Sequence, residues 1–568
     1  MSRPLSYAHC GSPKPLLGET IGQCLDRITR TYPDNEAMVS LHQGARFTYR
    51  QFSEIVDRAA RAYLRLGIRR GDRVAIWSTN NYEWAVTQYA TARIGAILVN
   101  INPAYQTHEV KYVLEQSRCR ILLLIESFKS SNYVAMFHDA CPEVSEVEDA
   151  VNGRIECPKY PHLEHVIFMG EDGPAGMIAW PDFMSLAEDV SDSELTERED
   201  DLDIDDHINI QYTSGTTGFP KGVTLTHNNI LNNGFVIGEY MQFTDQDRLC
   251  IPVPFYHCFG MVVGNLAAMT HGAAVIIPAA SFDPLATLQA VQDEKCTALH
   301  SVPTMFMAML EHPDFDRYDV TTLRTGITGA APCPIELMKK VTTTMHIPQI
   351  VTAYGQTEAS PLTTMTAPDD PVERRVDSVG KVVHHQELKI IDPATGKTVP
   401  RGEQGEICFR GYNIMAGYDN NPEATAEAID EQGWLHSGDL GTMDEEGYVR
   451  ITGRLKEMVI RGGENIYPRE IEEYLHTLDI IYDAAVVGVP DDRFGEEVLA
   501  CVKLQPGIPE PTEEEFRALC KGKIAHYKIP RYWWVVDEFP MTVTGKTQKF
   551  KIRDMAIEKL GLQAAAVS

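Results

Sequence analysis

Short runs of apolar, often β-branched residues alternate with longer amphipathic stretches through most of the chain. This alternation is typical of parallel strands joined by crossover helices. It therefore predicts a layered α/β architecture for the bulk of the chain. The runs that carry the prediction are RVAIWS (73–78), AILVN (96–100), CRILLLI (119–125), HVIFM (165–169), INIQYT (208–213), AAVIIPA (273–279) and TALHSVP (297–303).

The pattern changes from about Tyr418 onward, where the apolar runs become shorter. Turn signals recur at 430–433, 444–447 and 462–463, which predicts compact β elements followed by a small α+β module. We place a domain boundary near Arg454, so that residues 1–453 form a large N-terminal domain and residues 454–568 a small C-terminal domain.

Two stretches could be mistaken for other features. Residues 251–282 hold no Asp, Glu, Lys or Arg. A stretch of this length could cross a bilayer, but prolines, glycines and histidines interrupt it. We interpret it as buried strands and a helix. The acidic run 197–206 (EREDDLDIDD) lacks the glycine and spacing of a calcium loop, and we interpret it as a solvated connection.

Length, charge and cysteine content limit the classes of protein to which the chain can belong. A length of 568 residues predicts several folded units, and 51 basic against 80 acidic residues give a net charge of −29. The electrostatic field of this charge repels nucleic acid and anionic membrane surfaces, so we expect no nucleic-acid partner, while peripheral membrane association stays open. The twelve cysteines are scattered without metal-ligand spacing, and the first residues lack an apolar signal. Together these features predict a cytoplasmic protein with no transmembrane segment and reduced thiols, and they leave a homodimer open.

The strongest chemical signal is YTSGTTGFPKG (212–222), directly after the apolar run 208–212. Its glycines let backbone amides approach a ligand, its hydroxyls add donors and its lysine supplies a charge, which together suit phosphate oxygens. The spacing of a Walker loop is absent. The residues concerned are Thr213, Ser214, Gly215, Thr216, Thr217, Gly218 and Lys221.

This segment closely resembles the phosphate-loop signature of the adenylate-forming enzymes, the superfamily of acyl-CoA synthetases, luciferases and peptide-synthetase adenylation domains. Further motifs of that family follow in the expected order, so the resemblance covers most of the chain. It implies a large adenylation domain and a small domain that rotates about a hinge. The further motifs are Gly329-Ala330-Ala331-Pro332, Tyr354-Gly355-Gln356-Thr357-Glu358, Ser437-Gly438-Asp439, Gly453-Arg454-Leu455-Lys456 and Thr544-Gly545-Lys546.

The resemblance assigns roles to these motifs, with ATP, Mg²⁺ and CoA as cofactors or cosubstrates. Segments 329–331 and 354–357 correspond to the adenine pocket. Thr213 and Glu358 would hold Mg²⁺, since oxygen ligands suit this ion. Asp439 would accept hydrogen bonds from the ribose, with Arg454 as a charged donor nearby.

The remaining roles concern the two chemical steps. Lys546 would be the main catalytic cation of adenylation. Lys456 occupies the hinge position of the family, and Gly462 and Gly463 belong to the segment facing the CoA thiol, although a tight turn without ligand is an equal alternative for that segment. His257 matches an aromatic or histidine position at the entrance to the acyl site.

The segments 259–266, 300–307 and 359–364 should line the acyl pocket. They are apolar and lack Lys and Arg, which favours an apolar monocarboxylic acid as substrate. The leading hypothesis is an AMP-forming fatty-acyl-CoA ligase of the medium-chain type. An aryl-CoA ligase is the nearest alternative, and a stand-alone acyl-adenylating enzyme is a more distant one.

Two hypotheses come from other classes. An NTPase that releases ADP conflicts with the missing Walker spacing. A non-catalytic nucleotide-binding scaffold conflicts with the presence of both Glu358 and Lys546.

Overall fold

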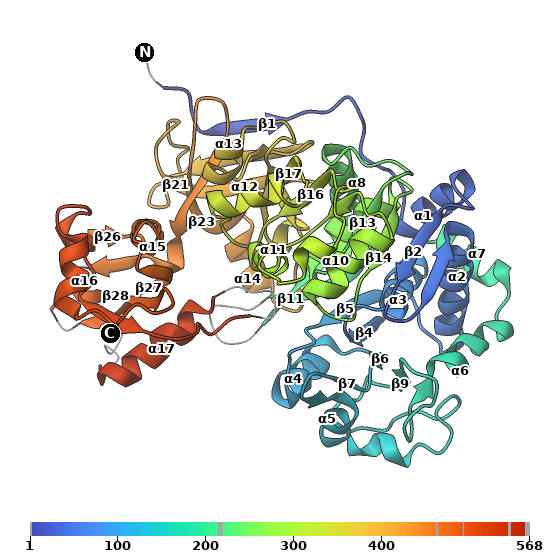
Figure 1. Ribbon diagram of the computed structural model, residues 1–568. Coiled ribbons are helices and arrows are strands. Elements are labelled where there is room, and N and C mark those ends of the chain that lie inside the picture. Colours follow the sequence, from blue (N-terminus) through green and yellow to red (C-terminus); the bar gives the residue numbers. More distant parts are fainter. Residues whose placement is uncertain (1–2, 214–219, 462–463, 492, 543–546, 563–568) are drawn as a thin grey trace. The chain divides into compact units, whose positions relative to one another are not determined.

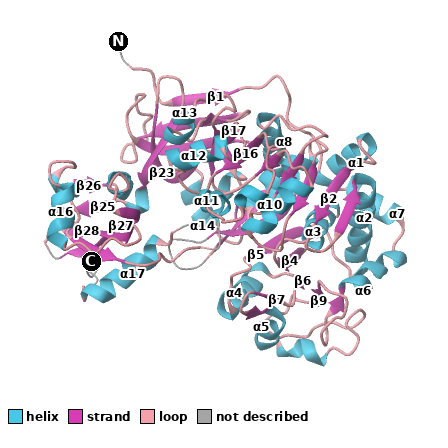
Figure 2. Cartoon of the chain, viewed as in Figure 1, coloured by secondary structure: helices cyan, strands magenta, loops and turns pink. Residues whose placement is uncertain are grey.

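The computed structural model describes residues 3–213, 220–461, 464–491, 493–542 and 547–562 (Figure 1). The chain forms two compact units. The larger unit comprises His9–Glu387 and Phe409–Leu435, and the smaller unit Met1–Ala8, Leu388–Cys408 and His436–Ser568. Both combine helices and strands (Figure 2), so the predicted α/β class is confirmed. The predicted boundary at Arg454 stays a prediction.

An eight-stranded sheet forms one layer of the larger unit. Its centre is parallel, while β12 and β22 join antiparallel at one side. The strands run in the order β10 (Ile178–Ala179), β9 (His165–Phe168), β6 (Ile121–Leu124), β4 (Arg73–Trp77), β5 (Ile97–Ile101), β11 (His207–Thr213), β12 (Lys221–Thr226) and β22 (Gly417–Tyr418).

Strand β4 shows why this sheet is buried on both faces. Successive side chains of a strand point to opposite faces. Val74 and Ile76 accordingly join one apolar cluster with residues of α2 (Tyr49–Arg65) and α3 (Tyr82–Arg93). Ala75 and Trp77 join another with residues of α4 (Thr107–Ser117) and α5 (Tyr133–Ala140).

A nine-stranded sheet forms the second layer of the larger unit. Residues on one face belong to a cluster with helices α10 (Pro284–Asp293), α11 (Pro303–Leu310) and α12 (Ile335–Thr343). The strands run in the order β19 (Lys381–Val382), β18 (Leu362–Met365), β17 (Gln349–Gly355), β16 (Thr325–Thr328), β15 (Ala298–Leu299), β13 (Arg248–Cys250), β14 (Ala274–Ile277), β2 (Glu36–Ser40) and β3 (Ala45–Thr48).

The smaller unit has its own sheet with helices on both faces. Alternate residues of the long strands β27 (Ile481–Asp491) and β28 (Gly495–Leu504) pack on α15 (Pro468–Leu475) and α16 (Glu513–Cys520) on one face and on α17 (Lys549–Leu560) on the other. The other strands of this sheet are β25 (Val459–Arg461), β26 (Glu464–Ile466) and β29 (Tyr532–Val535).

A further five-stranded sheet contains most of the strand residues between 388 and 454. Its order is β1 (Tyr7–Cys10), β20 (Gln386–Ile391), β21 (Gly405–Gly411), β23 (Leu435–Met443) and β24 (Val449–Arg454).

All seven apolar runs predicted as strands contain strands. The charge-free stretch 251–282 is buried, and it contains β14 and η3 (Phe259–Leu266), a π-helix. No helix in the described part of the chain is long and apolar enough to cross a membrane.

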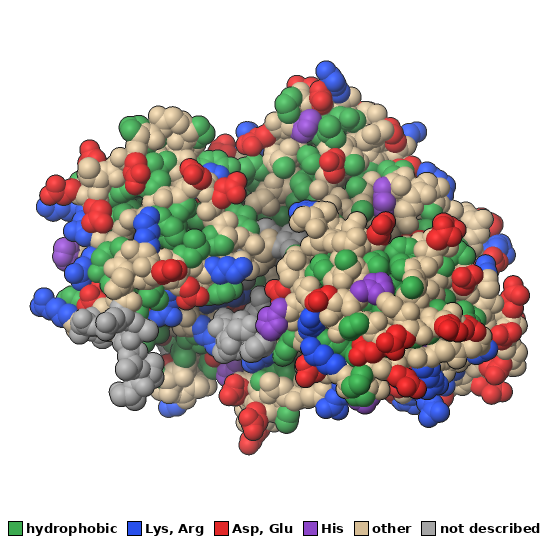
Figure 3. All heavy atoms as spheres, turned by 90° about the horizontal axis from the view of Figure 1, so that it is seen from below, with side chains coloured by type: hydrophobic (Ala, Val, Ile, Leu, Met, Phe, Trp, Pro, Cys, Tyr) green, Lys and Arg blue, Asp and Glu red, His purple; other side chains and the backbone are tan. Residues whose placement is uncertain are grey.

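The reading of the acidic run as a solvated connection is wrong in part. Its first residues belong to α7 (Asp192–Asp200), and the Glu199 carboxylate lies 2.6 Å from Nε of Arg93, whose side chain is 5% exposed. A buried arginine needs a carboxylate partner, and Glu199 is one of three that surround it. Elsewhere, acidic and basic side chains are interspersed over the face shown in Figure 3.

Candidate functional site

The glycine-rich segment connects two antiparallel strands of the eight-stranded sheet. Thr213 ends β11 and pairs in register with Lys221, which begins β12. The Thr213 hydroxyl donates to the Lys221 carbonyl at 3.4 Å. The predicted phosphate-loop residues Ser214, Gly215, Thr216, Thr217 and Gly218 lie outside the described residues. The two ends of the predicted loop are therefore held together by strand pairing.

Tyr418 connects Lys221 with Glu358. Strand β22 pairs with β12, and Nζ of Lys221 lies 4.9 Å from the centroid of the Tyr418 ring. The Tyr418 hydroxyl donates to Oε1 of Glu358 at 2.8 Å. Burial, and then the Glu358 carboxylate, raise the pKa of the Tyr418 phenol, which keeps it protonated as a donor. A lysine, a tyrosine and a carboxylate from three distant segments thus form one cluster.

The turn that carries Glu358 is tightly held. It follows β17, in which a Cβ on Gly355 would lie 1.9 Å from the carbonyl oxygen of Pro361, so only glycine fits there. Glu358 itself belongs to the short helix η5 (Thr357–Ala359). The Asn413 amide donates to the Ala359 carbonyl at 2.9 Å, and the Met415 N–H donates to the Glu358 carbonyl at 2.9 Å.

The two segments predicted to contact adenine follow neighbouring parallel strands. Gly329, Ala330 and Ala331 come directly after β16, and Tyr354, Gly355, Gln356 and Thr357 end β17 and begin the turn beyond it. Thr328 pairs in register with Thr352, so both segments leave the same edge of the sheet. Binding crevices lie at the carboxyl ends of strands in open α/β sheets.

His257 is followed by Cys258, whose thiol lies near the turn that carries Glu358. The His257 side chain is half-buried, and its Nδ1 accepts a hydrogen bond from the Phe259 N–H at 3.1 Å. The Cys258 thiol donates to Oε1 of Gln211 at 2.8 Å. Burial raises the pKa of Cys258 to about 12; a hydrogen bond with the Thr357 side chain opposes this effect, and the nearby Glu358 carboxylate adds to it. The segment 257–258 therefore approaches the predicted metal ligand.

The three predicted acyl segments share one apolar cluster. Met261, Val302, Met305, Ala359 and Leu362 all belong to it. The His300 ring stacks on Phe259 with centroids 6.0 Å apart, and burial lowers the pKa of His300 to about 3. His300 is therefore a neutral core residue.

Asp439 and Arg454 are neighbours in the smaller unit. They pair in register across β23 and β24, and Nε of Arg454 donates to Oδ1 of Asp439 at 2.7 Å. The preceding residues of β23 are held by Glu406, which accepts from the Gly438 N–H at 3.1 Å and from Nδ1 of His436 at 2.9 Å. The sequence signals Asp439 and Arg454 but not Glu406.

Lys456 belongs to η6 (Leu455–Glu457), and its side chain is exposed. Lys546, Gly462 and Gly463 lie outside the described residues. Lys549 begins α17, and its ammonium lies 3.1 Å from Glu457 and 2.8 Å from Glu472 of α15. Burial alone would lower the pKa of Lys549, but Glu472 and Glu457 raise it. This ion triad ties η6 to the start of α17, and the sequence did not reveal it.

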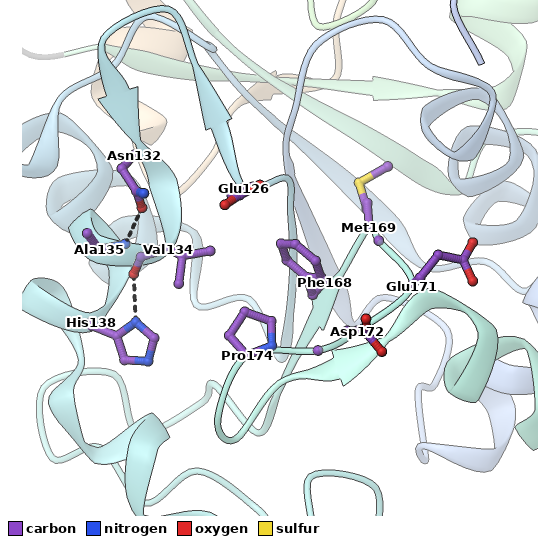
Figure 4. Close-up of a pocket in the computed structure, with 12 residues that line it drawn as sticks. Glu126, Asn132, Val134, Ala135, His138, Phe168, Met169, Glu171, Asp172 and Pro174 are labelled. Atoms are coloured by element: carbon purple, nitrogen blue, oxygen red, sulfur yellow. Dashed lines mark hydrogen bonds between the residues drawn. The ribbon is translucent and has the colours of Figure 1, made fainter.

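Two open hollows lie outside these motifs. One of about 800 Å³ is lined in the larger unit by residues that include Glu126, His138, Glu171 and Asp172 (Figure 4). Its carboxylates suit no polyphosphate, and it contains none of the predicted site residues. The other, also about 800 Å³, lies in the smaller unit and is lined by two carboxylates and four arginines, namely Arg461, Arg493, Arg517 and Arg531. Its excess of arginine suits an anion.

The comparisons identify relatives over the whole chain. The family model described as AMP-binding enzyme matches residues 25–419, and the model of the AMP-binding enzyme C-terminal domain matches residues 470–546. YngI of Bacillus subtilis (strain 168), a provisionally named acyl-CoA synthetase, is 50% identical over 97% of this chain and 99% of its own length.

A second relative and a solved structure extend the comparison. The mitochondrial medium-chain acyl-CoA ligase ACSF2 of Danio rerio is 44% identical over 98% of this chain and 91% of its own length. The crystal structure of the anthranilate CoA ligase AuaEII in complex with anthranoyl-AMP is similar with a TM-score of 0.82 and 27% identity, covering 97% of this chain and 99% of that one.

Proposed function

Given that this chain belongs to the AMP-binding enzyme family, we propose that it is an ATP- and Mg²⁺-dependent acyl-CoA ligase. A carboxylate attacks the α-phosphorus of ATP to form an acyl-adenylate and pyrophosphate, and the thiol of CoA then displaces AMP. The first step brings two anions together, so charge neutralisation and positioning are the main tasks of the protein.

The observation that carries this proposal is the cluster of Thr213, Lys221, Tyr418 and Glu358 at the ends of the glycine-rich segment. The hydroxyl of Thr213 and the carboxylate of Glu358 are oxygen donors, the kind that Mg²⁺ prefers. We assign the ion to these two residues, where it would neutralise phosphate charge. Tyr418 orients Glu358, and Lys221 adds a cation beside the loop.

We assign the ribose to Asp439, whose carboxylate is oriented by Arg454. Lys546 is the proposed catalytic cation of adenylation, and Lys456 the proposed hinge, about which the smaller domain rotates between the two steps.

The arginine-lined hollow is the proposed site for the phosphates of CoA, with Gly462 and Gly463 in the segment that faces its thiol.

For the acyl substrate we propose an apolar monocarboxylic acid, a fatty acid of the medium-chain type. The shared cluster of the three acyl segments supports it, as does the medium-chain ligase among the relatives. The similarity to an anthranilate CoA ligase keeps an aromatic acid as the second candidate. We place the reaction in the cytoplasm, since the twelve cysteines are all free.

The test is product analysis of the purified protein with Mg²⁺, ATP and a panel of short- to long-chain and aromatic acids, with and without CoA. We expect AMP and pyrophosphate only when acid is present, and a thioester only when CoA is added. Formation of ADP, or nucleotide turnover that does not depend on acid, would refute the proposal.

A further inference from the structure

Cys141, Glu143 and Cys157 form a compact group in the larger unit, outside the motifs described above. Cys141 directly follows α5, Glu143 belongs to η1 (Pro142–Glu146), and Cys157 lies in the loop before β9. One sulfur from each cysteine and a carboxylate oxygen of Glu143 all lie within 4.8 Å of one another. The cysteines are 0% and 4% exposed and neither is in a disulfide.

Two polar oxygens at this group are left without partners. Within the described residues, Oε2 of Glu143 is buried and has no hydrogen-bond partner, and the same holds for the hydroxyl of Tyr160. Tyr160 is within electrostatic range of both cysteines. A buried polar atom without a partner costs about 1–3 kcal/mol. A ligand that bonds to these oxygens would remove that cost.

The spacing of the three atoms suits a small cation. Zinc–sulfur bonds of about 2.3 Å in a tetrahedral site put two sulfurs about 3.8 Å apart. The two sulfurs need to approach each other by no more than about 1 Å to reach that distance. Cys141 also sits at the C-terminal end of the eight-residue helix α5, where the helix dipole favours positive charge.

We propose that Cys141, Glu143 and Cys157 form a binding site for a thiolate-preferring divalent cation, Zn²⁺ above all. Thiolates select zinc over magnesium, which prefers oxygen ligands. Binding replaces the two thiol protons, which pass to the solvent, and leaves the fourth position to the Tyr160 hydroxyl or to water. The site is independent of the proposed Mg²⁺ ligands Thr213 and Glu358.

The test uses the full-length protein, stripped with a chelator and kept reduced, and titrated with Co²⁺. We expect one equivalent of Co²⁺ to give a thiolate-to-cobalt charge-transfer band that Zn²⁺ abolishes. Cys141→Ser and Cys157→Ser should each lose the band. Glu143→Gln keeps both sulfurs and should weaken zinc affinity on the order of 100-fold, at the upper end of the roughly 10- to 100-fold cost of losing an outer partner.

The matched control is the double variant Cys250→Ser/Cys296→Ser. These cysteines are fully buried neighbours, but in the described part of the chain they belong to no group of three side chains that could hold a metal ion. It should keep the band. Absence of the band in the parent protein, or its persistence in Cys141→Ser and Cys157→Ser, would overturn the proposal. Since the Mg²⁺-dependent release of pyrophosphate should survive in both single variants, failure of this site is distinguishable from failure of the ligase proposal.

Discussion

At the scale of single residues, Tyr418 is the contact on which the proposed metal site depends most. Its hydroxyl fixes one oxygen of Glu358, and its ring lies beside Nζ of Lys221. A hydrogen bond to a charged group is worth about 1.5–3 kcal/mol. We predict that Tyr418→Phe raises the Mg²⁺ concentration for half-maximal adenylation about 10-fold, since about 1.4 kcal/mol corresponds to a factor of ten. Acid-dependent exchange of pyrophosphate into ATP measures this.

The matched control for Tyr418→Phe is Tyr49→Phe. Tyr49 is buried and its hydroxyl donates to the Ala273 carbonyl at 2.7 Å, so the variant removes the same atom at a position away from the cluster. This variant should lose stability but keep the parent's Mg²⁺ dependence. If a folded Tyr418→Phe protein also keeps the parent's Mg²⁺ dependence, Tyr418 does not orient the proposed metal ligand.

His227 should make the stability of the larger unit depend on pH. It is fully buried, and its Nδ1 accepts a hydrogen bond from the N–H of Ile21, the first residue of α1 (Ile21–Thr31). Burial lowers the pKa of His227 to about 4, while Asp206 and Asp203 oppose this effect. The folded protein therefore binds the proton more weakly than the unfolded chain, which titrates near about 6.5.

It follows that the stabilisation from His227 is present above about pH 6.5 and is lost as the pH falls toward 4. The full change in the free energy of unfolding between these two pH values is roughly 3 kcal/mol, at about 1.4 kcal/mol per pKa unit. We predict that His227→Gln, which does not titrate, destabilises the protein at pH 7 and that the gap to the parent narrows or reverses near pH 4.5. Thermal unfolding of both proteins across this range measures it. A gap that stays constant with pH would contradict the assignment.

At the scale of elements, η6 should decide how the two chemical steps are balanced. Proline at position 456 would fix the backbone and remove an N–H at the proposed hinge. We predict that Lys456→Pro slows thioester formation at least about 10-fold more than adenylation, because the proposed domain rotation comes between the two steps. Lys546→Ala should do the reverse, abolishing pyrophosphate release while a supplied acyl-adenylate still reacts with CoA.

The control for the hinge is Lys456→Ala, which removes the same exposed side chain and leaves the backbone free. It should keep the parent's ratio of the two steps, measured separately as pyrophosphate release and thioester formation. If the proline and alanine variants have equal effects, the defect comes from loss of the side chain, and Lys456 is not the hinge.

The arginine-lined hollow lies beside the turn between β27 and β28. Arg493 of this turn is exposed, so its loss should leave the unit folded. An exposed ion pair is worth up to about 1 kcal/mol, so we predict that Arg493→Gln raises KM for CoA up to about 5-fold and leaves KM for ATP unchanged. Lys503→Gln removes one positive charge from β28 outside the hollow and should change neither constant. Equal effects of the two variants would point to general electrostatics.

The elements differ in how far the sequence determines them. The run 73–78 predicts a strand because its residues are apolar on both faces, and β4 is found there. Asp439 and Arg454 are predicted through their motifs, and a local hairpin of β23 and β24 brings them together. Tyr418 could not be predicted, because its position depends on the pairing of β22 with β12, almost two hundred residues earlier in the chain.

Other differences arise from tertiary contacts that local patterns do not encode. Glu199 lies in a run of acidic residues that looks solvated, yet the buried Arg93 pairs with it across the helices. The apolar segment 259–266 predicts a buried element, but its π-helical form has no local sequence signal. Lys549 resembles any surface lysine until α15 and η6 place two carboxylates against it.

At the scale of the whole molecule, the two units carry separate parts of the proposed site. The larger unit carries Thr213, Lys221 and Glu358, and the smaller unit carries Asp439 and Lys456. The sequence predicts the phosphate-loop and hinge motifs because each is contiguous in the chain, and both stay predictions. We expect the preference for one acid to depend on residues of three separate segments, which belong to one apolar cluster.

The most direct test of the central claim follows oxygen atoms from the acid. A carboxylic acid labelled with oxygen-18 at both positions is converted with ATP, Mg²⁺ and CoA, and the products are examined by mass spectrometry. If the carboxylate attacks the α-phosphorus, the AMP must carry one labelled oxygen and the thioester must keep the other. Label in inorganic phosphate together with ADP, or unlabelled AMP, would contradict an acyl-adenylate intermediate and with it the proposed reaction.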